Sequence, residues 1–475
     1  MTRIAKFALA ALCSISVSLA PGSSVGQETT AITDVSIVDV ETGEILPGST
    51  VVIEGGRIVS VAEGADVPAA ATTIDGSGRF LMPGLWDMHA HMRADVAPTV
   101  LMPQFIASGV TGVREMASDC AGGGVCLADM LEWRERIDAG ELPGPRIIQL
   151  SSAPINPPFG GGAGENGMRT LVRRAHDRGA DLIKVYYRLD PEALGWIVDE
   201  AEALGMYAGG HIPIRMTAAE VSEAGLRTLE HARDFLFDCF PGSADFRATT
   251  TSQNPPMDVM RSMVDDHQPE VCDATFATFV RNGTWYVPTH VTRRMDAYAN
   301  DPDFRDDPRR IYIPADAWDS WQADADGMVA LDPSPEGRRI VRGFYEKGLE
   351  LTGRAHDAGV NILLGTDAGD TYVFPGSGAH DELGELVKAG LTPAEALATG
   401  TINAARFAGL EDEHGTVAVG KRADLVLLEA NPLEDIANTR GIAAVVLGGR
   451  VYDRVELDAM LEGVVARIAE YDAGG

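Results

Sequence analysis

Near the amino terminus, hydrophobic and polar residues alternate in three consecutive stretches. The segments "ITDVSIVDV", "STVVIEGGRIVSVAE" and "ATTIDGSGRFLMPG" have the two-residue period of half-buried strands, and glycine-containing turns separate them. The same pattern returns near the other end of the chain in "GTVAVGKRADLVLLEANP" and "IAAVVLGGRVY". We therefore expect residues 27–80 and 410–475 to form one small β domain, a β-sandwich built from both termini.

The pattern changes between residues 81 and 409, where short apolar strands alternate with segments of helical periodicity. Strands separated by helices are typical of parallel βα units, and eight such units predict a (β/α)8 barrel, or TIM barrel. The chain is therefore expected to be an α/β protein in which the barrel interrupts the smaller β domain. The candidate strands are "LMPGLWDMHAH", "VTGVREMA", "PRIIQLS", "DLIKVYY", "YAGGHIP", "TLEHA", "TWYVPTHV" and "NILLGTD".

Two connections of the predicted barrel are too long to be simple loops. Residues 235–280 include "DCFPGSADFRATTTSQNPPMD", and residues 293–335 include "YANDPDFRDDPRRIYIPADAWDSWQADAD". Each follows the carboxyl end of a strand, which is the side of such barrels where active sites lie. Both insertions are therefore predicted to be lids or specificity elements.

The first 26 residues have the layout of a secretory signal peptide. Arg3 and Lys6 precede the apolar run "FALAALCSISVSLA", and small residues follow in "PGSSVGQETT". The run is too short for an ordinary membrane span, so no stable membrane insertion is expected after cleavage. A retained amino-terminal anchor is the alternative. Cleavage near Gly26 and Gln27 predicts a periplasmic or secreted protein.

Export changes how the cysteines are interpreted. Four cysteines remain once Cys13 is removed with the leader. In an oxidising compartment, the sequence predicts the disulfides Cys120–Cys126, across the short segment "AGGGV", and Cys239–Cys272, within the first long insertion. Free buried thiols are the alternative. The spacing of the cysteines fits no thiolate metal site.

The charge balance limits the kinds of partner that the chain can bind. It has 39 Lys and Arg residues against 70 Asp and Glu residues, a formal net charge of −31. Such a surface repels nucleic acid and anionic lipid headgroups, so neither is expected as a partner. A small-molecule substrate is expected instead, and the sequence leaves a homo-oligomer open.

Polar side chains end several strands of the predicted barrel. His89 and His91 close the first strand, and because strand side chains alternate faces, both point the same way, about 6–7 Å apart. That geometry suits two ligands of one metal ion, and histidines with a structural role are the alternative. Further polar residues reach the same rim, and one of them is a lysine inside an apolar strand, where a lone ammonium is costly. Together they predict a metal site at the rim. These residues are Lys184, His211, His231 and Asp367.

The chain resembles the amidohydrolase superfamily, in its imidazolonepropionase-like and Xaa-Pro-dipeptidase-like branch. The resemblance rests on "HAH" after "PGLWDM", on "GTDAG", and on "AGLTPAEALATGTINAARFAGL" before "GTVAVGKRADLVLL". It implies two divalent metal ions bridged by a carboxylated Lys184. It also implies which ion each ligand holds: His89, His91 and Asp367 one ion, and His211 and His231 the other. Imidazole and oxygen ligands favour Zn²⁺, with Mn²⁺ or Co²⁺ as alternatives. A mononuclear site with an unmodified lysine is the structural alternative.

Such a site suits amide hydrolysis. Two divalent ions lower the pKa of bound water and polarise a carbonyl group, so a metal-activated hydroxide can attack. Asp367 is expected to take the proton of the hydroxide and deliver it to the leaving amine. His290, at the end of the seventh strand, is predicted to hydrogen-bond the tetrahedral intermediate. Tyr186 and Arg188 are candidate substrate contacts, with ordinary packing or surface pairing as the alternative for each.

The sequence thus predicts an exported, metal-dependent amidohydrolase that cleaves the amide or peptide bond of a dipeptide or an N-acyl amino acid. One alternative is hydrolysis of cyclic amides, lactones or other esters on the same binuclear site. The other is a metal-binding homologue without catalytic activity. The fold does not decide the substrate, because barrel rims and insertions set specificity.

Overall fold

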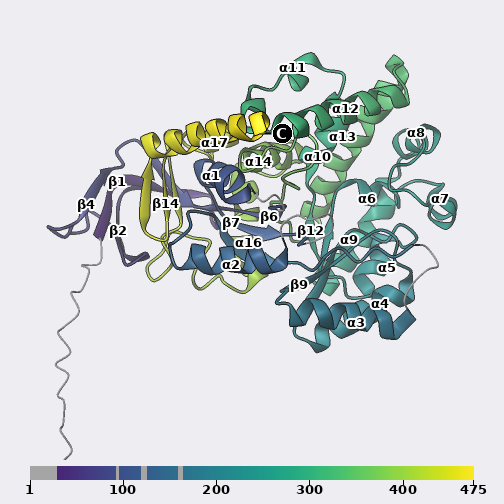
Figure 1. Ribbon diagram of the computed structural model, residues 1–475, viewed down its shortest axis with the longest axis horizontal. Helices are drawn as coiled ribbons and strands as arrows, with labels where there is room; N and C mark the ends of the chain where they lie inside the picture. The colour runs from purple at the N-terminus through teal and green to yellow at the C-terminus, as the bar shows by residue number, and fades with distance from the viewer. Residues whose placement is uncertain (1–28, 93–95, 119–125, 159–163, 475) are drawn as a thin grey trace, which may run out of the picture.

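The computed structural model describes residues 29–92, 96–118, 126–158 and 164–474 (Figure 1). The predicted signal peptide, residues 1–26, lies outside the described residues. The predicted Cys120–Cys126 disulfide also lies outside them, because Cys120 does. Among the helices that the structure describes, none has the length and apolar character needed to cross a lipid bilayer.

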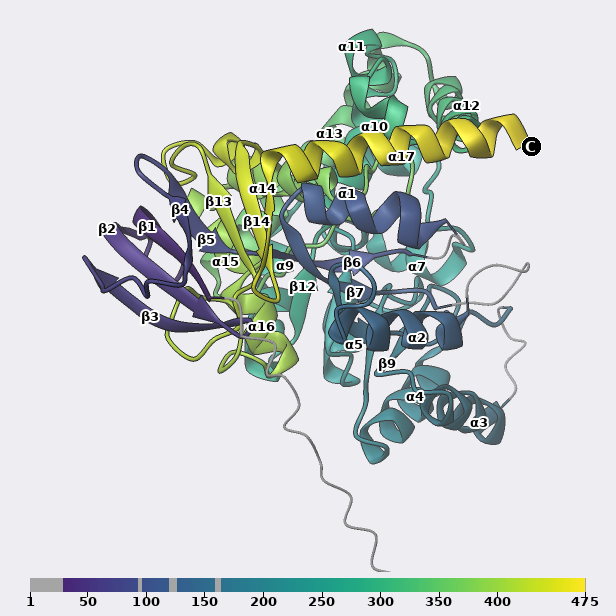
Figure 2. The same ribbon diagram turned by 60° about the vertical axis from the view of Figure 1, so that its left-hand side comes forward.

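Strands from both ends of the chain form one mixed sheet at one end of the molecule (Figure 2). Its order is β15-β14-β13-β5-β1-β2-β3, and β4 pairs with β1. β13 lies antiparallel to β5, with Leu427 opposite Leu81, so this pairing joins the two ends of the chain. The sandwich arrangement of these strands stays a prediction. The strands are β1 (Thr29–Asp39), β2 (Glu44–Glu54), β3 (Arg57–Glu63), β4 (Thr72–Asp75), β5 (Phe80–Pro83), β13 (Leu425–Leu428), β14 (Ile442–Leu447) and β15 (Arg450–Asp453).

The alternation seen in the sequence explains how this sheet is stabilised. Ile32 of β1 pairs with Val51 of β2, and both side chains are fully buried. They belong to one apolar cluster with Leu81 and Leu425, which come from opposite ends of the chain. Burial of these apolar side chains is what holds the two termini together.

The strands of the predicted barrel are parallel and fall into two sheets, β6-β7-β8 and β9-β10-β11-β12. Isolated parallel bridges connect their edges. Ser151 pairs with Leu182 between the two sheets, and residues 361–368 bridge β12 and β6 through Ile362 and Ala368. The strands are β6 (Leu85–Ala90), β7 (Val110–Glu115), β8 (Arg146–Leu150), β9 (Leu182–Val185), β10 (Tyr207–Gly210), β11 (Thr228–Glu230) and β12 (Trp285–Val287).

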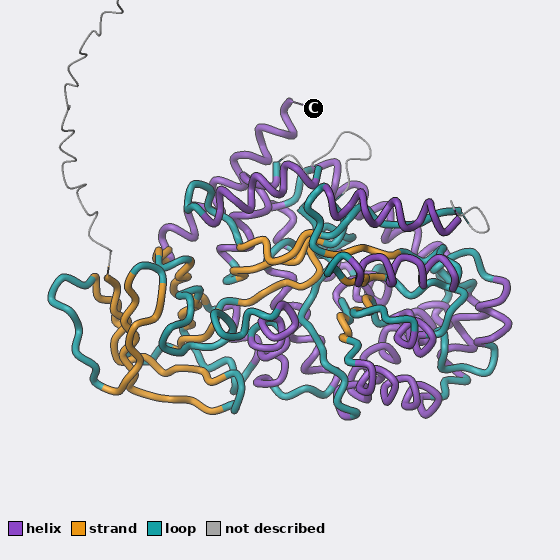
Figure 3. The backbone as a smooth tube through the Cα atoms, turned by 90° about the horizontal axis from the view of Figure 1, so that it is seen from below, coloured by secondary structure: helices purple, strands orange, loops and turns teal. Residues whose placement is uncertain are grey.

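Helices alternate with the parallel strands and enclose them, while the mixed sheet lies apart at the other end (Figure 3). Local signals fix several helix starts: the Asp190 side chain accepts a hydrogen bond from Ala193 N, and Thr217 and Thr392 form capping boxes. The helices outside the two long connections are η1 (Ala97–Leu101), α1 (Met102–Ala107), α2 (Leu127–Asp138), α3 (Gly164–Asp177), α4 (Pro191–Ala203), α5 (Ala218–Glu223), α13 (Pro335–Asp357), α14 (Ser377–Ala389), α15 (Pro393–Thr399), α16 (Ile402–Ala408), η3 (Ile436–Arg440) and α17 (Arg454–Gly474).

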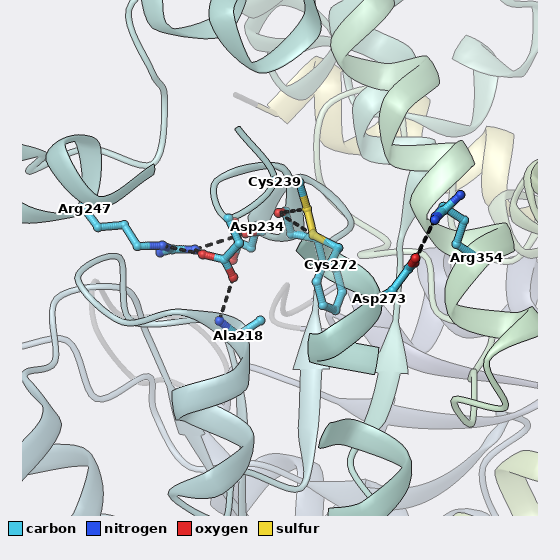
Figure 4. The surroundings of a disulfide bond; sticks show 9 residues. Ala218, Asp234, Cys239, Arg247, Cys272, Asp273 and Arg354 are labelled. Carbon is cyan, nitrogen blue, oxygen red and sulfur yellow. Dashed lines mark hydrogen bonds and ion pairs between the residues drawn. A yellow bond between two sulfur atoms is a disulfide. The ribbon is translucent and has the colours of Figure 1, made fainter. Parts of the chain in front are cut away.

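Both long connections of the predicted barrel are largely helical. The first contains the predicted disulfide: Cys239 and Cys272 are bonded, with their Cα atoms 5.7 Å apart (Figure 4). That prediction is confirmed. The helices of the first connection are α6 (Arg233–Leu236), α7 (Ser243–Thr249), α8 (Met257–Asp265) and α9 (Pro269–Asn282). Those of the second are α10 (His290–Tyr298), α11 (Pro302–Arg305), η2 (Pro308–Tyr312) and α12 (Ala315–Leu331).

Candidate metal centre

One cavity of about 810 Å³ lies at the carboxyl ends of the parallel strands. The structure brings all six predicted ligand residues to its wall, although they are spread over nearly 280 positions of the chain. Parallel strands make this convergence natural, since their carboxyl ends meet at one rim. The six residues are His89, His91, Lys184, His211, His231 and Asp367.

The polar atoms of the site lie close together. Asp367 Oδ1 is 2.7 Å from His91 Nε2 and 3.5 Å from His89 Nε2. Lys184 Nζ is 3.4 Å from His89 Nε2. Single ligand atoms of His89, His231 and Asp367 all lie within 4.8 Å of one another, which is a spacing that one metal ion can span. The His211 ring is next to them, with its centroid 4.4 Å from that of His231.

Backbone geometry places these side chains. His231 and Asp367 both have a left-handed backbone conformation, with φ of 73° and 65°. Residues other than glycine adopt this conformation at a cost, and such residues cluster at functional sites. Gly365 allows the eighth segment to approach His89, because a Cβ atom there would lie 2.9 Å from His89 Cβ. A Cβ atom at Gly210 would lie 3.1 Å from Lys184 Cδ, so this glycine makes room for the lysine.

Each of the four histidines has a hydrogen-bonding partner at Nδ1. Metal-binding histidines typically donate the hydrogen of one ring nitrogen to an oxygen, which orients the other nitrogen toward the ion. The partners of His89, His91 and His231 are oxygens. His231 Nε2 is buried and has no hydrogen-bond partner among the described residues. The four contacts are His89 Nδ1 to Glu230 Oε2 at 2.8 Å, His91 Nδ1 to Glu115 Oε1 at 3.4 Å, His231 Nδ1 to Thr289 Oγ1 at 2.8 Å, and His211 Nδ1 to Gln253 Nε2 at 2.8 Å.

Burial disfavours the charged forms of the lysine and of three of the histidines. It lowers the pKa of Lys184 to about 8 and that of His89 to about 4. It also lowers the pKa of His211 and of His231 well below the usual value. Neutral imidazole is the form that binds a metal ion, and a neutral lysine amine is the form that can add carbon dioxide.

His91 and Asp367 behave differently because they form a hydrogen-bonded pair. Burial alone would lower the pKa of His91, but the hydrogen bonds to Asp367 and Glu115 outweigh it and raise the pKa to about 9. Burial alone would raise the pKa of Asp367, but the charges of His89 and His91 keep it well below its usual range. Asp367 is therefore an ionised carboxylate, which can bind a cation and accept a proton.

The residues present fit a divalent metal centre. Four imidazoles, one carboxylate and one amine of lowered pKa face a single cavity, and the buried Nε2 of His231 lacks a partner that an ion would supply. Nitrogen and oxygen donors of this kind suit zinc and related ions. The role of each residue as a ligand is a proposal, taken up below.

Sequence reasoning missed the outer partners of the histidines. Glu230 precedes His231 directly, and its carboxylate also binds Arg114 Nη2 at 2.9 Å. Glu115 ends β7 and accepts hydrogen bonds from the backbone N–H groups of Met92 and Ala117. Acidic residues at the ends of otherwise apolar strands, in "TLEHA" and "VTGVREMA", were the signal that could have identified them.

His290 is not brought to the cavity wall that the structure describes. The chain turns at Thr289, which has a φ of 47°, and His290 then begins α10. Its side chain is fully buried against α13, where Nε2 lies 2.9 Å from Thr352 Oγ1. From this position the side chain does not reach the described cavity wall, where the sequence had been expected to place it.

The two candidate substrate contacts have different surroundings. Tyr186 lines the cavity, and its ring centroid is 4.0 Å from that of His211. Arg188 does not line the described cavity wall, because the chain has already left the strand. Its guanidinium group lies over the Tyr187 ring and donates a hydrogen bond to the Tyr187 hydroxyl at 3.0 Å.

Both long insertions contribute to the cavity wall. From the first come Gln253 and Asn254, and from the second come Arg293, Asp296 and Asp324. Arg293 is paired with Asp296. The wall therefore presents charges of both signs above the candidate metal centre.

A parallel α/β fold with four imidazoles, a lysine and a carboxylate at its strand ends is the arrangement expected of a metal-dependent hydrolase. The chain belongs to the amidohydrolase family, whose model matches residues 80–452. This confirms the family predicted from the sequence. Family membership and the parallel strands together give a TIM-barrel-type α/β fold.

Known proteins resemble the chain to different extents. The ochratoxinase of Aspergillus niger is 24% identical over 472 residues, covering 86% of this chain and 84% of the ochratoxinase. The adenine deaminase of Desulforamulus reducens is 44% identical over 77 residues, which are 16% of this chain and only 12% of the deaminase. The solved structure of a Xaa-Pro dipeptidase with bound methionine in its active site is 20% identical with a TM-score of 0.64, covering 90% of this chain and 100% of the dipeptidase.

Proposed function

We propose that this protein hydrolyses the amide or peptide bond of a small molecule, a dipeptide or an N-acyl amino acid, in a metal-dependent reaction. The observation that carries the proposal is the cluster of six side chains at one cavity, with its buried and unpartnered His231 Nε2. The names of two similar proteins, an ochratoxinase and a Xaa-Pro dipeptidase, support this class of reaction.

Two divalent ions, with Zn²⁺ favoured and Mn²⁺ or Co²⁺ as alternatives, would be held by these residues. His89, His91 and Asp367 would bind one ion, and His211 and His231 the other. Lys184, once carboxylated, would bridge them. In that modification the neutral Nζ forms a bond to the carbon of carbon dioxide and loses a proton, so a buried amine becomes an anionic ligand. When bound, the ions would activate water and polarise the substrate carbonyl.

Asp367 has the geometry and charge of a proton carrier. Its carboxylate is ionised and lines the cavity beside His91, so it can accept the proton of the attacking water. The same oxygen can then deliver that proton to the nitrogen of the leaving amine. An amine leaves readily only after protonation, so this transfer completes cleavage of the amide bond.

Tyr186 is the better placed of the two predicted substrate contacts. Tyr186 lines the cavity beside His211, so its hydroxyl can donate a hydrogen bond to the substrate. Arg188, stacked on Tyr187, has no such position. The cationic side chains that do line the cavity are Arg233 and Arg293.

We also propose that the parallel strands close into a complete eight-stranded barrel over residues 81–409. The bridges of Ser151, Ile362 and Ala368 support closure, because they connect the two parallel sheets and the eighth segment in ring order. Residues 27–80 and 410–475 would form the small β-sandwich domain, and the regions 235–280 and 293–335 would act as lids.

Export to the periplasm or the medium is part of the same proposal. It is supported by the leader-like pattern of residues 1–26 and by the Cys239–Cys272 disulfide, a bond typical of oxidising compartments. The mass of the protein recovered from cells tests it. Loss of about the first 26 residues is expected, and an intact amino terminus in the recovered protein would contradict export by cleavage.

The experiment that tests the activity is a substrate screen. Purified protein loaded with Zn²⁺ or Mn²⁺ is assayed against dipeptides, N-acyl amino acids, cyclic amides and lactones. Asp367→Asn is the matched control, because it removes the proton acceptor and changes little in size. Hydrolysis of dipeptides or N-acyl amino acids by the wild type alone is expected. Hydrolysis of lactones only, or equal rates in both proteins, would overturn the proposal.

A further inference from the structure

The first insertion brings one side chain into direct contact with the candidate metal centre. Gln253, in the loop between α7 and α8, lies with its Nε2 2.8 Å from His211 Nδ1. Its Oε1 accepts a hydrogen bond from Arg233 Nη2 at 3.1 Å. One amide group therefore connects a predicted metal ligand to an arginine of the cavity wall.

The segment that carries Gln253 is anchored on both sides. Upstream, the buried Arg247 pairs with Asp238 and donates a hydrogen bond to Ile214 O at 3.0 Å. The disulfide between Cys239 and Cys272 closes the insertion at its base (Figure 4). These contacts fix the loop, so Gln253 can hold a neighbouring side chain in place.

When His211 binds a metal ion, this contact has more hydrogen-bond donors than acceptors. The Arg233 guanidinium has only donors. A histidine that binds an ion through Nε2 carries its hydrogen on Nδ1, so it too is a donor toward Gln253. The amide has one oxygen and one NH₂ group, and these face opposite neighbours. With the oxygen toward Arg233, the NH₂ group faces His211 as a second donor.

We propose that Gln253 is a positioning residue that exchanges partners when His211 holds a metal ion. Its oxygen then accepts the hydrogen bond of His211 Nδ1, and Arg233 loses its amide partner. Arg233 lines the cavity, and its Nε lies 3.5 Å from Asp234 Oδ1, so the edge that Gln253 holds is the one at Nη2. The released guanidinium edge is the group that binds the carboxylate of the substrate. The proposal rests on the proposed function, because it requires a metal ion at His211.

Two variants of the metal-loaded protein test this assignment. Gln253→Ala removes both contacts and should speed the loss of the His211-bound ion to a chelator by about 10–100-fold, the usual effect of losing such a partner. Gln253→Glu supplies two oxygens, so it should retain the ion at least as well as the wild type. Its carboxylate also keeps Arg233 engaged. Asn254→Ala is the matched control, since it changes the neighbouring wall residue without touching the contact with His211.

The second measurement is the KM of the carboxylate substrate cleaved best in the screen, compared with its carboxyl-amidated analogue. In Gln253→Glu, KM for the carboxylate should rise about tenfold with kcat retained, while KM for the amidated analogue stays unchanged. Wild-type metal retention in Gln253→Ala, or an unchanged ratio of the two KM values in Gln253→Glu, would overturn the inference. A wild-type protein that binds no metal ion would overturn the proposed function as well, so the two failures are distinguishable.

Discussion

Glu230 holds His89 and Arg114 at the same time. Its Oε2 lies 2.8 Å from His89 Nδ1 and its Oε1 lies 2.9 Å from Arg114 Nη2, and all three side chains are at most 1% exposed. Arg114 in turn donates a hydrogen bond to the backbone oxygen of Met88, next to His89. The pair therefore fixes both the ring and the backbone of the first histidine of the site.

Glu230→Gln should be costly for stability and for metal binding. It leaves the buried Arg114 without a counter-charge, which typically costs about 3–5 kcal/mol of the free energy of unfolding. Metal affinity should fall about 10–100-fold because His89 loses its orienting carboxylate. Urea unfolding and metal content measure the two effects. Glu413→Gln, which breaks the exposed pair with Arg57, serves as the control and should cost under about 1 kcal/mol. A Glu230→Gln protein as stable as that control would contradict this role.

Lys184→Ala should remove the bridging ligand. We expect loss of at least one of the two ions. Activity should fall about a hundredfold, the upper end of the range seen when a residue that orients metal ligands is removed. Lys388→Ala, at an exposed lysine that pairs with Glu385, is the matched control. Carboxylation itself is read from ¹³C NMR of protein equilibrated with ¹³C-labelled bicarbonate. A new carbamate signal that is missing in Lys184→Ala is expected, and identical spectra of the two proteins would rule the modification out.

His290→Gln should change the pH dependence of stability more than catalysis. Burial lowers the pKa of His290 to about 3, whereas the unfolded chain has a histidine pKa of about 6.5. Between these values the unfolded state binds the proton first, so stability is full above about pH 6.5 and is lost as the pH falls. The slope is about 1.4 kcal/mol per pH unit for this group.

The variant cannot titrate at this position and should lose less stability on acidification, which urea unfolding between pH 7 and pH 4 measures. Its kcat/KM should stay within about threefold of the wild type, because the side chain contacts Thr352 and does not line the described cavity. A folded variant with about a hundredfold lower kcat/KM would instead support the catalytic role that the sequence predicted for His290. His176→Gln, at an exposed histidine, controls for the loss of a histidine elsewhere.

Removing the disulfide should loosen the insertion that carries Gln253. The bond closes a loop with a sequence separation of 33 residues, for which loop-closure entropy gives about 3–4 kcal/mol. The double variant Cys239→Ser/Cys272→Ser should lose that much stability in urea unfolding without reductant. Addition of reductant should destabilise the wild type by a similar amount. Equal unfolding midpoints of wild type and double variant would show that the bond contributes nothing.

The sequence predicted those parts of the site that depend on strand period and strand order. His89 and His91 follow from the two-residue period of one strand, and Lys184 and His211 from their positions in parallel strands whose ends meet. Asp367 could be predicted once the eighth strand was recognised. All of these residues line the same cavity, as expected.

The remaining features depend on backbone turns and loops that have no periodic signal. His290 follows its strand as expected, but the turn at Thr289 directs it toward α13. Arg188 lies beyond its strand and stacks on Tyr187. Gln253 belongs to an irregular loop whose path is set by a disulfide and by the buried Arg247, so no local pattern places it beside His211.

The central claim is that this chain hydrolyses amide bonds by means of divalent ions held at the strand ends. The most direct measurement is hydrolysis of the best dipeptide or N-acyl amino acid before metal removal, after treatment with a chelator, and after re-addition of Zn²⁺ or Mn²⁺. The account predicts activity in the first state, background rates in the second, recovery in the third, and about two ions per chain in both active states. Unchanged hydrolysis by the metal-free protein would contradict it.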